Sequence, residues 1–194
     1  MKVVIATKNQ HKLTEFKRIL EPLGYEVLSM QDVQVDIDVE ETGHTFEENS
    51  MLKAQAIYQA TGLCTIADDS GLLVDYLNGE PGVYSARYGG EGLTDQDRCQ
   101  LVLQKLQNVP KTQRTARFVC AISLIFSQGD KRVYRGECEG WIGLEPLGNN
   151  GFGYDPIFMV DEQKSFAVID GIQKDMMSHR GKALKRMEAD LKAQ

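Results

Sequence analysis

The segment Arg117–Phe126 is the most continuously apolar part of the chain and constrains the fold more than any other feature. It reads RFVCAISLIF, so a strand formed here carries apolar side chains on both faces, and both faces must be covered. This pattern is typical of a central strand in a sheet with helices on either side. The QGDK turn that follows predicts a hairpin with the segment 132–144, RVYRGECEGWIGL.

Helix and strand patterns alternate along the rest of the chain. We expect helices to begin near Gln10, Thr45, Thr94 and Ser178. Strands are predicted at KVVIAT (2–7), YEVLSM (25–30), CTIA (64–67), LLVDYL (72–77) and PIFMV (156–160). CTIA and LLVDYL are expected to be separate strands, because the DDSG between them is good turn chemistry. The alternation predicts an α/β fold, a mixed sheet flanked by helices.

The second predicted helix is the best marked. Thr45 and Glu48 have the spacing of a capping box, and Gly62 is a stop signal. The apolar stripe expected on this helix consists of Leu52, Ala56 and Ala60.

Length and charge exclude several classes of protein. The chain has 194 residues and a formal net charge of -6, which fits one domain and argues against binding to duplex DNA. No apolar stretch approaches the roughly 20 residues that span a bilayer, and the N-terminus has no signal-peptide cleavage site. The four cysteines lie far apart, so we expect buried free thiols and no zinc site. We therefore expect a cytoplasmic protein that binds neither nucleic acid nor membrane.

The TKNQHK segment, 7–12, follows the first strand and opens a helix. The N–H groups at a helix start have no partners within the helix, and the helix dipole favours anions there. The side chains of Thr7, Asn9 and Lys12 add donors, so this segment is a candidate phosphate cradle without being a Walker loop. The alternative is a polar strand-to-helix turn with a solvated lysine.

Acidic residues precede and begin the second helix. Glu40 and Glu41 offer the carboxylate oxygens that Mg²⁺ prefers, and Lys53 offers a point charge for a phosphate. The alternative is an acidic loop followed by the glutamates that are common in a first helical turn. That alternative explains Glu47 and Glu48 better than it explains the pair in the loop.

Asp68 and Asp69 stand side by side after an apolar strand. Adjacent buried carboxylates are costly without partners, and ligands of open α/β sheets bind at the carboxyl ends of strands. The pair therefore suits a metal or an acid/base role, with a simple turn as the alternative. If the chain is extended here, the two side chains point to opposite faces, and only one of them looks into any given site.

The glycine-rich loop GNNGFGYDPIF, 148–158, and the segment KDMMSHRG, 174–181, form the last candidate. Glycines let the backbone approach a ligand closely, and Phe152 and Tyr154 offer flat faces on which a base can stack. The donors of the second segment, suited to a carbonyl oxygen or a phosphate, are Lys174, His179 and Arg180. The alternative is a turn and a polar helix start, and for His179 alone it is the favoured interpretation.

Five segments occur in order from end to end: ATKNQHK, EETGHTFEENSMLKA, ADDSGLLVDYLNGEPGVYSARY, NNGFGYDPIF and SHRGKAL. On these residues the chain closely resembles the non-standard purine nucleoside triphosphate pyrophosphatases, or inosine triphosphate pyrophosphatase family, in its bacterial dITP/XTP branch. The resemblance covers essentially the whole chain, so residues 1–194 are expected to form a single two-lobed domain. Lys8 departs from the pattern, because many relatives have glycine there.

This resemblance implies both a reaction and an architecture. A purine nucleoside triphosphate and water would give the monophosphate and pyrophosphate, with Mg²⁺ as cofactor. The implied substrates are ITP, dITP and XTP, which would thereby be kept out of DNA and RNA. The implied fold is an elongated two-lobed α/β structure with a central cleft, assembled as a homodimer.

The resemblance also implies roles for individual residues. Asp69 would be the general base and a metal ligand, and the pair Glu40 and Glu41 would supply a second acidic ligand. Whether Asp69 takes the proton of the attacking water or orients that water stays open. The implied substrate-binding residues are Thr7, Lys8, Asn9, Gln10, His11, Lys12, Lys53, Ser70, Phe152, Gly153, Tyr154, Asp155, Lys174, His179 and Arg180.

Base selection is expected to rest on the 6-position of the purine. The carbonyl of inosine and xanthosine would accept hydrogen bonds from Lys174, His179 or Arg180, whereas the amine of adenosine would face another donor. The exclusion of GTP stays open, because guanosine carries the same carbonyl. Two rival functions are a phosphohydrolase or kinase that releases orthophosphate and a nucleotide sensor without turnover. The presence of Asp69 and Glu41 argues against the sensor.

Overall fold

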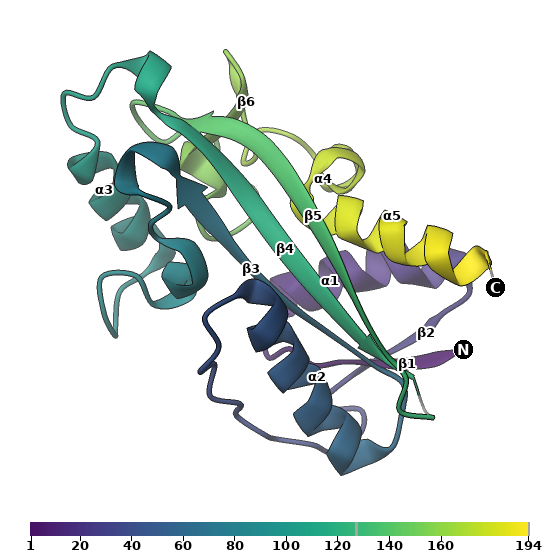
Figure 1. Cartoon of the computed structure of the whole chain (residues 1–194). Coiled ribbons are helices and arrows are strands. Elements are labelled where there is room, and N and C mark those ends of the chain that lie inside the picture. Colours follow the sequence, from purple (N-terminus) through teal and green to yellow (C-terminus); the bar gives the residue numbers. More distant parts are fainter. Residues whose placement is uncertain (127, 194) are drawn as a thin grey trace. The chain divides into compact units, whose positions relative to one another are not determined.

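The computed structural model describes residues 1–126 and 128–193, and the chain forms two compact units (Figure 1). Unit 1 comprises Met1–Asp69, Cys120–Gly136 and the segment from Arg180 onward. Unit 2 comprises Ser70–Val119 and Glu137–His179. Each unit is therefore built from segments that are distant in the sequence.

Strands and helices alternate along the chain, as expected. The strands are β1 (Lys2–Ile5), β2 (Glu26–Ser29), β3 (Thr65–Val74), β4 (Thr115–Ile125), β5 (Lys131–Ile142), β6 (Phe158–Asp161) and β7 (Lys164–Ser165). The α-helices are α1 (Gln10–Leu20), α2 (Phe46–Thr61), α3 (Asp95–Lys105), α4 (Gly171–Met177) and α5 (His179–Lys192). The strand order is β2-β1-β3-β4-β5-β6-β7, which confirms the predicted mixed sheet flanked by helices.

In unit 1, β1 lies between β2 and β3 and runs parallel to both. Ile5 is paired with Ser29 of β2 and with Ile66 of β3. Parallel strands covered on both faces are continuously apolar, which explains the composition of β1. This register brings the loop that follows β1 next to Asp68, two residues beyond Ile66.

The two faces of this sheet carry different helices. Val3 and Ile5 pack in one cluster with side chains of α1 and α5. Val4 and Ala6 point the other way and pack with α2. The alternation of strand side chains between faces thus decides which helix each residue of β1 and β3 meets.

Unit 2 has its own core, which the later strands share with α3. Leu72 and Val74 from the second half of β3 pack with Val102 and Leu106 from the region of α3. Three aromatic rings fill the middle of this core, with Phe118 and Phe158 at 4.6 Å and Phe118 and Phe166 at 5.7 Å between centroids.

Several local signals are confirmed. Helix α1 begins at Gln10, the Thr45 side chain caps α2, and Thr94 and Asp97 form a complete capping box at α3. The cap of α1 is Asn9, which was expected to be a donor in the phosphate cradle and here accepts from the N–H groups of His11 and Lys12. At α2 the box is incomplete, since the Glu48 carboxylate accepts from the N–H of His44. The predicted hairpin is present, with β4 and β5 adjacent in the sheet.

The prediction that CTIA and LLVDYL form two separate strands is wrong. β3 runs without a break from Thr65 to Val74, so DDSG lies inside a strand. Hydrogen bonding between β3 and its sheet neighbours overrides the local turn preference of these residues. Asp68 and Asp69 therefore occupy the middle of β3, and the first segment of unit 1 ends at Asp69.

The apolar stripe expected on α2 is also wrong. Leu52 is 39% exposed, whereas Asn49 and Ser50 are fully buried beside Ala54 and Ile57. Polar residues face inward here because they have buried partners, which the apolar pattern alone cannot reveal. Helix α4 was not predicted; its signal is Asp170, whose side chain accepts from the N–H of Gln173.

All four cysteines are free and buried, as expected. Among the described residues, no helix has the length and apolar character needed to cross a membrane.

Candidate active site

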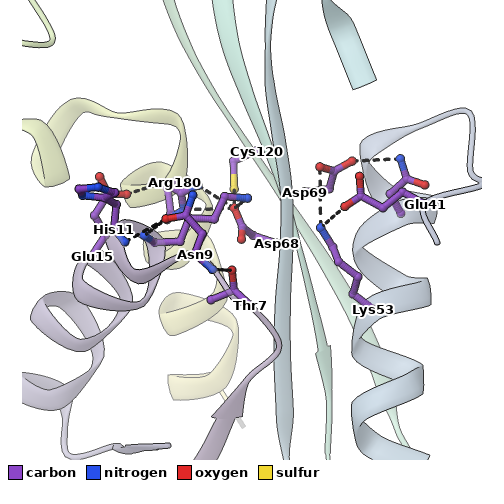
Figure 2. A network of polar contacts seen from close by, with 12 residues as sticks. Thr7, Asn9, His11, Glu15, Glu41, Lys53, Asp68, Asp69, Cys120 and Arg180 are labelled. Carbon is purple, nitrogen blue, oxygen red and sulfur yellow. Dashed lines mark hydrogen bonds and ion pairs between the residues drawn. The ribbon is translucent and has the colours of Figure 1, made fainter. Parts of the chain in front are cut away.

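Asp68 and Asp69 point to opposite faces of β3, as strand geometry predicts (Figure 2). Asp68 faces the residues of α1 and α5, and Asp69 faces those of α2. Both side chains are buried, at 2% and 6% exposure of the residue. Each carboxylate must therefore be explained by its own set of partners.

Asp68 lies at the centre of a buried cluster of charges. Its Oδ2 accepts from Nε and Nη2 of Arg180 at 3.2 and 2.7 Å, and lies 3.1 Å from Nζ of Lys12. Arg180 also donates through Nη1 to the carboxylate of Glu15. Burial alone would raise the pKa of Asp68, but Arg180 and the nearby lysines outweigh it and hold the pKa far below its usual range.

Arg180 was expected to contact the purine base, but in the structure it belongs to this cluster. Arg180 is 1% exposed, and its guanidinium donates to carboxylates of unit 1. Burial would lower the pKa of Arg180, but Asp68 and Glu15 raise it above its usual value. His179, the preceding residue, belongs to unit 2. A contact of Arg180 with a purine stays a prediction.

Asp69 is held by residues of α2 and the loop before it. Its Oδ2 accepts from Nδ2 of Asn49 at 3.1 Å, and its Oδ1 lies 3.9 Å from Nζ of Lys53. Lys53 also donates to Oε1 of Glu41 at 2.5 Å, so one ammonium lies between two carboxylates. Burial raises the pKa of Asp69 to about 6 against the opposing effect of Lys53, and Glu41 adds a smaller upward contribution.

Lys53 keeps its charge in this setting. Burial alone would lower its pKa, but Asp69, Asp68 and Glu41 outweigh burial and raise the pKa above its ordinary value. The ammonium is therefore available as a fixed positive charge throughout the physiological range.

The raised pKa of Asp69 predicts that metal-free protein loses stability, relative to Asp69→Asn, as the pH rises. A carboxyl with a raised folded pKa contributes stability below its unfolded pKa, and the contribution is lost as the pH passes its folded pKa. A folded pKa of about 6 predicts that the wild type loses about 1 kcal/mol relative to Asp69→Asn between pH 5 and 8. Urea unfolding of both proteins in EDTA measures this difference. An unchanged difference at the two pH values would contradict the raised pKa.

The structure distinguishes between the two candidate glutamates. Glu41 is half-buried and bonded to Lys53, whereas Glu40 is exposed. Among the described residues, no group of three His, Cys, Asp or Glu side chains is placed to hold a metal ion. Glu41 raises the pKa of Asp69, and two such neighbouring carboxylates nevertheless suit Mg²⁺, which binds through one or two carboxylates and completes its shell with water and phosphate oxygens.

The candidate phosphate cradle has fewer available backbone donors than expected. The N–H groups of His11 and Lys12 donate to Oδ1 of Asn9, at 2.9 and 3.2 Å. The N–H of Asn9 itself donates to Oγ1 of Thr7. A phosphate here would rely on side chains such as Lys12, or would displace the Asn9 cap.

A cavity of about 410 Å³ opens beside this loop in unit 1. Its lining includes Thr7, Lys8 and Gln10 of this loop and residues of the segment 29–36 at and after the end of β2. The Lys8 ammonium lies 2.9 Å from Asp36, and its side chain is half-exposed. The positive charge of Lys8, at a position where many relatives were expected to have glycine, is thus paired with Asp36.

The glycine-rich loop of unit 2 is held by the carboxylate of Asp155. Its Oδ2 accepts from the N–H of Phe152 at 2.9 Å and from Nζ of Lys174 at 2.7 Å. Gly151 has a φ of +76°, and a Cβ at this position would lie 2.0 Å from the same oxygen. The glycine is therefore required by close packing as well as by backbone conformation.

Substituting Gly151 tests this packing against a matched control. Gly151→Ala should destabilise the protein by about 2 kcal/mol, because it combines a left-handed φ with a clash against a buried carboxylate. Gly153→Ala has a similar φ of +60° and no neighbour within 4 Å, so it should show only the backbone cost of about 1 kcal/mol. Thermal unfolding of both variants measures the difference. Equal losses would show that the clash with Asp155 is relieved without cost.

The rings of this loop differ in availability. Tyr154 is 4% exposed, and its hydroxyl donates to the carbonyl of Ser85. Phe152 is only half-buried, and Nζ of Lys174 lies 5.0 Å from its ring centroid. Phe152 is thus the better placed of the two predicted stacking residues, and Tyr154 belongs to the core.

Two more residues of unit 2 were predicted to bind substrate, His179 and Ser70. His179 is 5% exposed and stacks on Phe118 at 4.7 Å between centroids. Ser70 is half-buried in the middle of β3. Burial and stacking hold the ring plane of His179 in place, and a fixed ring suits a directional hydrogen bond to a ligand.

Sequence reasoning missed Glu15 of unit 1 altogether, and it assigned no role of their own to Asn49 and Asp68. Asn49 had a signal, since it lies four residues before Lys53 on the same helical face. Asp68 was recognised together with its neighbour, but its cationic partners come from α1 and α5. Glu15 has no local signal, because its partner Arg180 lies 165 residues away.

Unit 1 is an α/β sheet in which the carboxylate of Asp69 and the ammonium groups of Lys12 and Lys53 lie at one strand, and cations and carboxylates of this kind suit an enzyme that acts on phosphate groups. Comparison with known proteins agrees with this class. The chain belongs to the Ham1 family, whose model matches residues 3–190.

Relatives cover nearly the whole chain. A dITP/XTP pyrophosphatase of Bacillus subtilis is 48% identical over 191 residues, 98% of this chain and 96% of the relative. One of Bacillus licheniformis is 48% identical over 188 residues, 96% of each. These matches confirm the resemblance to the non-standard purine triphosphate pyrophosphatases.

Solved structures agree with the fold. The Ham1 protein of Staphylococcus aureus has a TM-score of 0.87 and 44% identity, with 100% of this chain and 99% of that chain covered. A HAM1 protein of Coxiella burnetii has a TM-score of 0.89 and 40% identity, with both chains fully covered.

Proposed function

We propose that this chain is a nucleoside triphosphate pyrophosphohydrolase that converts ITP, dITP and XTP to the monophosphate and pyrophosphate. The observation that carries the proposal is the 48% identity, over nearly the full length, to two proteins named dITP/XTP pyrophosphatase. The charges around Asp69 support it, because attack on a polyphosphate requires both cations and a proton acceptor. The activity would remove deaminated purines before they enter DNA or RNA.

The residues of unit 1 would handle the phosphates. Lys53 and Lys12 would neutralise charge on the phosphate oxygens. The raised pKa of Lys53 supports this role, because it keeps the ammonium charged. Asp69 would accept the proton of the attacking water or orient that water. A pKa of about 6 suits a proton acceptor that works near neutral pH.

A divalent cation, which we propose to be Mg²⁺, would be held by Asp69 and Glu41. The cation would neutralise the charge that develops on the phosphate oxygens during hydrolysis. The bond from Lys53 to Glu41 supports the choice of Glu41 over Glu40, since Lys53 also approaches Asp69. Lys53 would shift from Glu41 toward phosphate once a cation takes its place.

The residues of unit 2 would recognise the base. Phe152 would stack on the purine, with Asp155 holding the loop in place. Lys174 and His179 would donate to the 6-carbonyl, and adenosine would be rejected because its amine cannot accept such bonds. We further propose a cytoplasmic homodimer that does not bind nucleic acid.

Hydrolysis of ITP, XTP, GTP and ATP with Mg²⁺ tests the function when pyrophosphate and orthophosphate are detected separately. We expect pyrophosphate from ITP and XTP and little of either product from ATP or GTP. Orthophosphate without pyrophosphate would indicate a different phosphohydrolase. Binding of ITP without any product would indicate a nucleotide sensor.

A further inference from the structure

Helix α2 carries a buried amide whose two ends have different partners. Nδ2 of Asn49 donates to Oδ2 of Asp69 at 3.1 Å, and its Oδ1 accepts from the N–H of Gly43 at 2.8 Å. Asn49 is fully buried. A backbone N–H can only donate and a carboxylate can only accept, so these partners define which end of the amide faces Asp69.

Gly43 fits closely against this amide. A Cβ at position 43 would lie 2.7 Å from Oδ1 of Asn49 and 2.7 Å from Cβ of Glu48. Any other residue at this position would have to push the loop or the amide away. The loop therefore approaches α2 closely enough to hold Asn49 only because residue 43 is glycine.

The bond from Asn49 leaves the two oxygens of Asp69 in different surroundings. Oδ2 is tied to Asn49, whereas Oδ1 lies on the side of Lys53. Asn49 and Lys53 are one turn apart on α2, so a single rigid helix sets both sides of the carboxylate. Rotation of the carboxylate would break the Asn49 bond.

We infer that Asn49 is a positioning residue, held by Gly43, that orients Asp69 so that Oδ1 faces the cation and the attacking water. This inference rests on the proposed function of Asp69. Aspartate at position 49 would place a second carboxylate against Asp69, and leucine would remove both the bond to Asp69 and the bond from Gly43. Partners that orient a metal-binding carboxylate typically contribute 10- to 100-fold in metal affinity or activity.

The first test is Asn49→Ala with Ser50→Ala as its control. Ser50 is the next residue, is equally buried, and bonds to Ser123 and to the carbonyl of Glu47. We expect Asn49→Ala to lower kcat for ITP by about 10- to 100-fold with KM changed less than about threefold. Ser50→Ala should retain kcat within about threefold. Equal loss of kcat in the two variants would show that Asn49 acts only through stability and would overturn the inference.

The second test combines Gly43→Ala with Asn49→Ala. If Gly43 acts through the amide, Gly43→Ala should lower kcat by about tenfold in the wild type and by less than about twofold in Asn49→Ala. Equal losses in both backgrounds would overturn the link between Gly43 and Asn49. Because kcat is measured on folded protein, a loss of stability in any one variant does not decide the outcome.

The third test measures binding of Mn²⁺, as a stand-in for Mg²⁺, by paramagnetic resonance without nucleotide. Asn49→Ala should raise the Kd for Mn²⁺ about tenfold, and Ser50→Ala should leave it unchanged. A wild type that binds Mn²⁺ without releasing pyrophosphate would contradict the proposed function alone. A wild type that does neither would overturn both, and equal Kd values in wild type and Asn49→Ala would overturn the inference.

Discussion

Replacing Asp69 by asparagine should lower kcat for ITP by at least about a thousandfold and leave the fold intact. Asparagine has the size of aspartate but neither its negative charge nor its capacity to take a proton. The variant would lose the proton acceptor and weaken the cation site at the same time. Asn49 and Lys53 would remain in place, because they also bond to Gly43 and Glu41.

The stability of this variant separates catalysis from folding. A buried carboxylate with a raised pKa opposes folding at neutral pH, so Asp69→Asn should unfold at the same temperature as the wild type or higher. Single-turnover release of pyrophosphate and thermal unfolding in EDTA measure the two properties. Full activity in the variant would refute the role of Asp69.

Much of the fold could be predicted because its signals are local. The helix starts predicted at Thr45 and Thr94 depend on bonds within four residues, and the structure has both caps. The opposite orientation of Asp68 and Asp69 follows from strand geometry alone. Such features need no knowledge of the tertiary structure.

The surroundings of the two aspartates could not be predicted, because they depend on long-range packing. Arg180 reaches Asp68 across 112 residues, and Asn49 reaches Asp69 only because α2 covers one particular face of the sheet. The sequence places Arg180 beside His179, yet the two belong to different units. The sequence therefore could not reveal that the neighbours His179 and Arg180 have different partners within the chain, Phe118 for the first and Asp68 with Glu15 for the second.

Strand β3 shows how packing overrides local preference. Ser70 and Gly71 favour a turn, but they lie within a strand that has neighbours on both sides. The consequence for the site is large, because an extended backbone keeps Asp68 and Asp69 on opposite faces, where a turn would have allowed both to face one ligand.

Replacing Asp68 by asparagine should have the opposite effect from the change at Asp69, with a loss of stability of about 3 kcal/mol. Asp68 is the main anion that faces Arg180, and Lys12 lies 3.1 Å from the same oxygen. Removing one member of a buried ion pair leaves the other charge in a poorly solvated place. Glu15 would compensate for only part of the guanidinium charge.

Asp36→Asn is the matched control for this variant. The Asp36 carboxylate also pairs with a lysine, but its side chain is 91% exposed, so the change should alter stability by less than about 0.5 kcal/mol. The lowered pKa of Asp68 means that its contribution is present above the unfolded pKa of about 4 and lost as the pH falls below it. The difference between wild type and Asp68→Asn in urea unfolding should therefore persist from pH 8 to 5 and shrink in more acidic solution.

The asparagine variants of these two adjacent residues are thus expected to change stability in opposite directions. If Asp68→Asn loses turnover at unchanged stability, Asp68 takes part in the chemistry. Substrate would then replace Asp68 as the partner of Arg180 and Lys12. If the variant loses stability while the protein that remains folded turns over ITP normally, the pair of Asp68 and Arg180 is structural, and α5 is anchored to the sheet through Arg180. We expect the second result, because the acceptor Oδ2 of Asp68 already lies within 3.2 Å of three cationic nitrogen atoms.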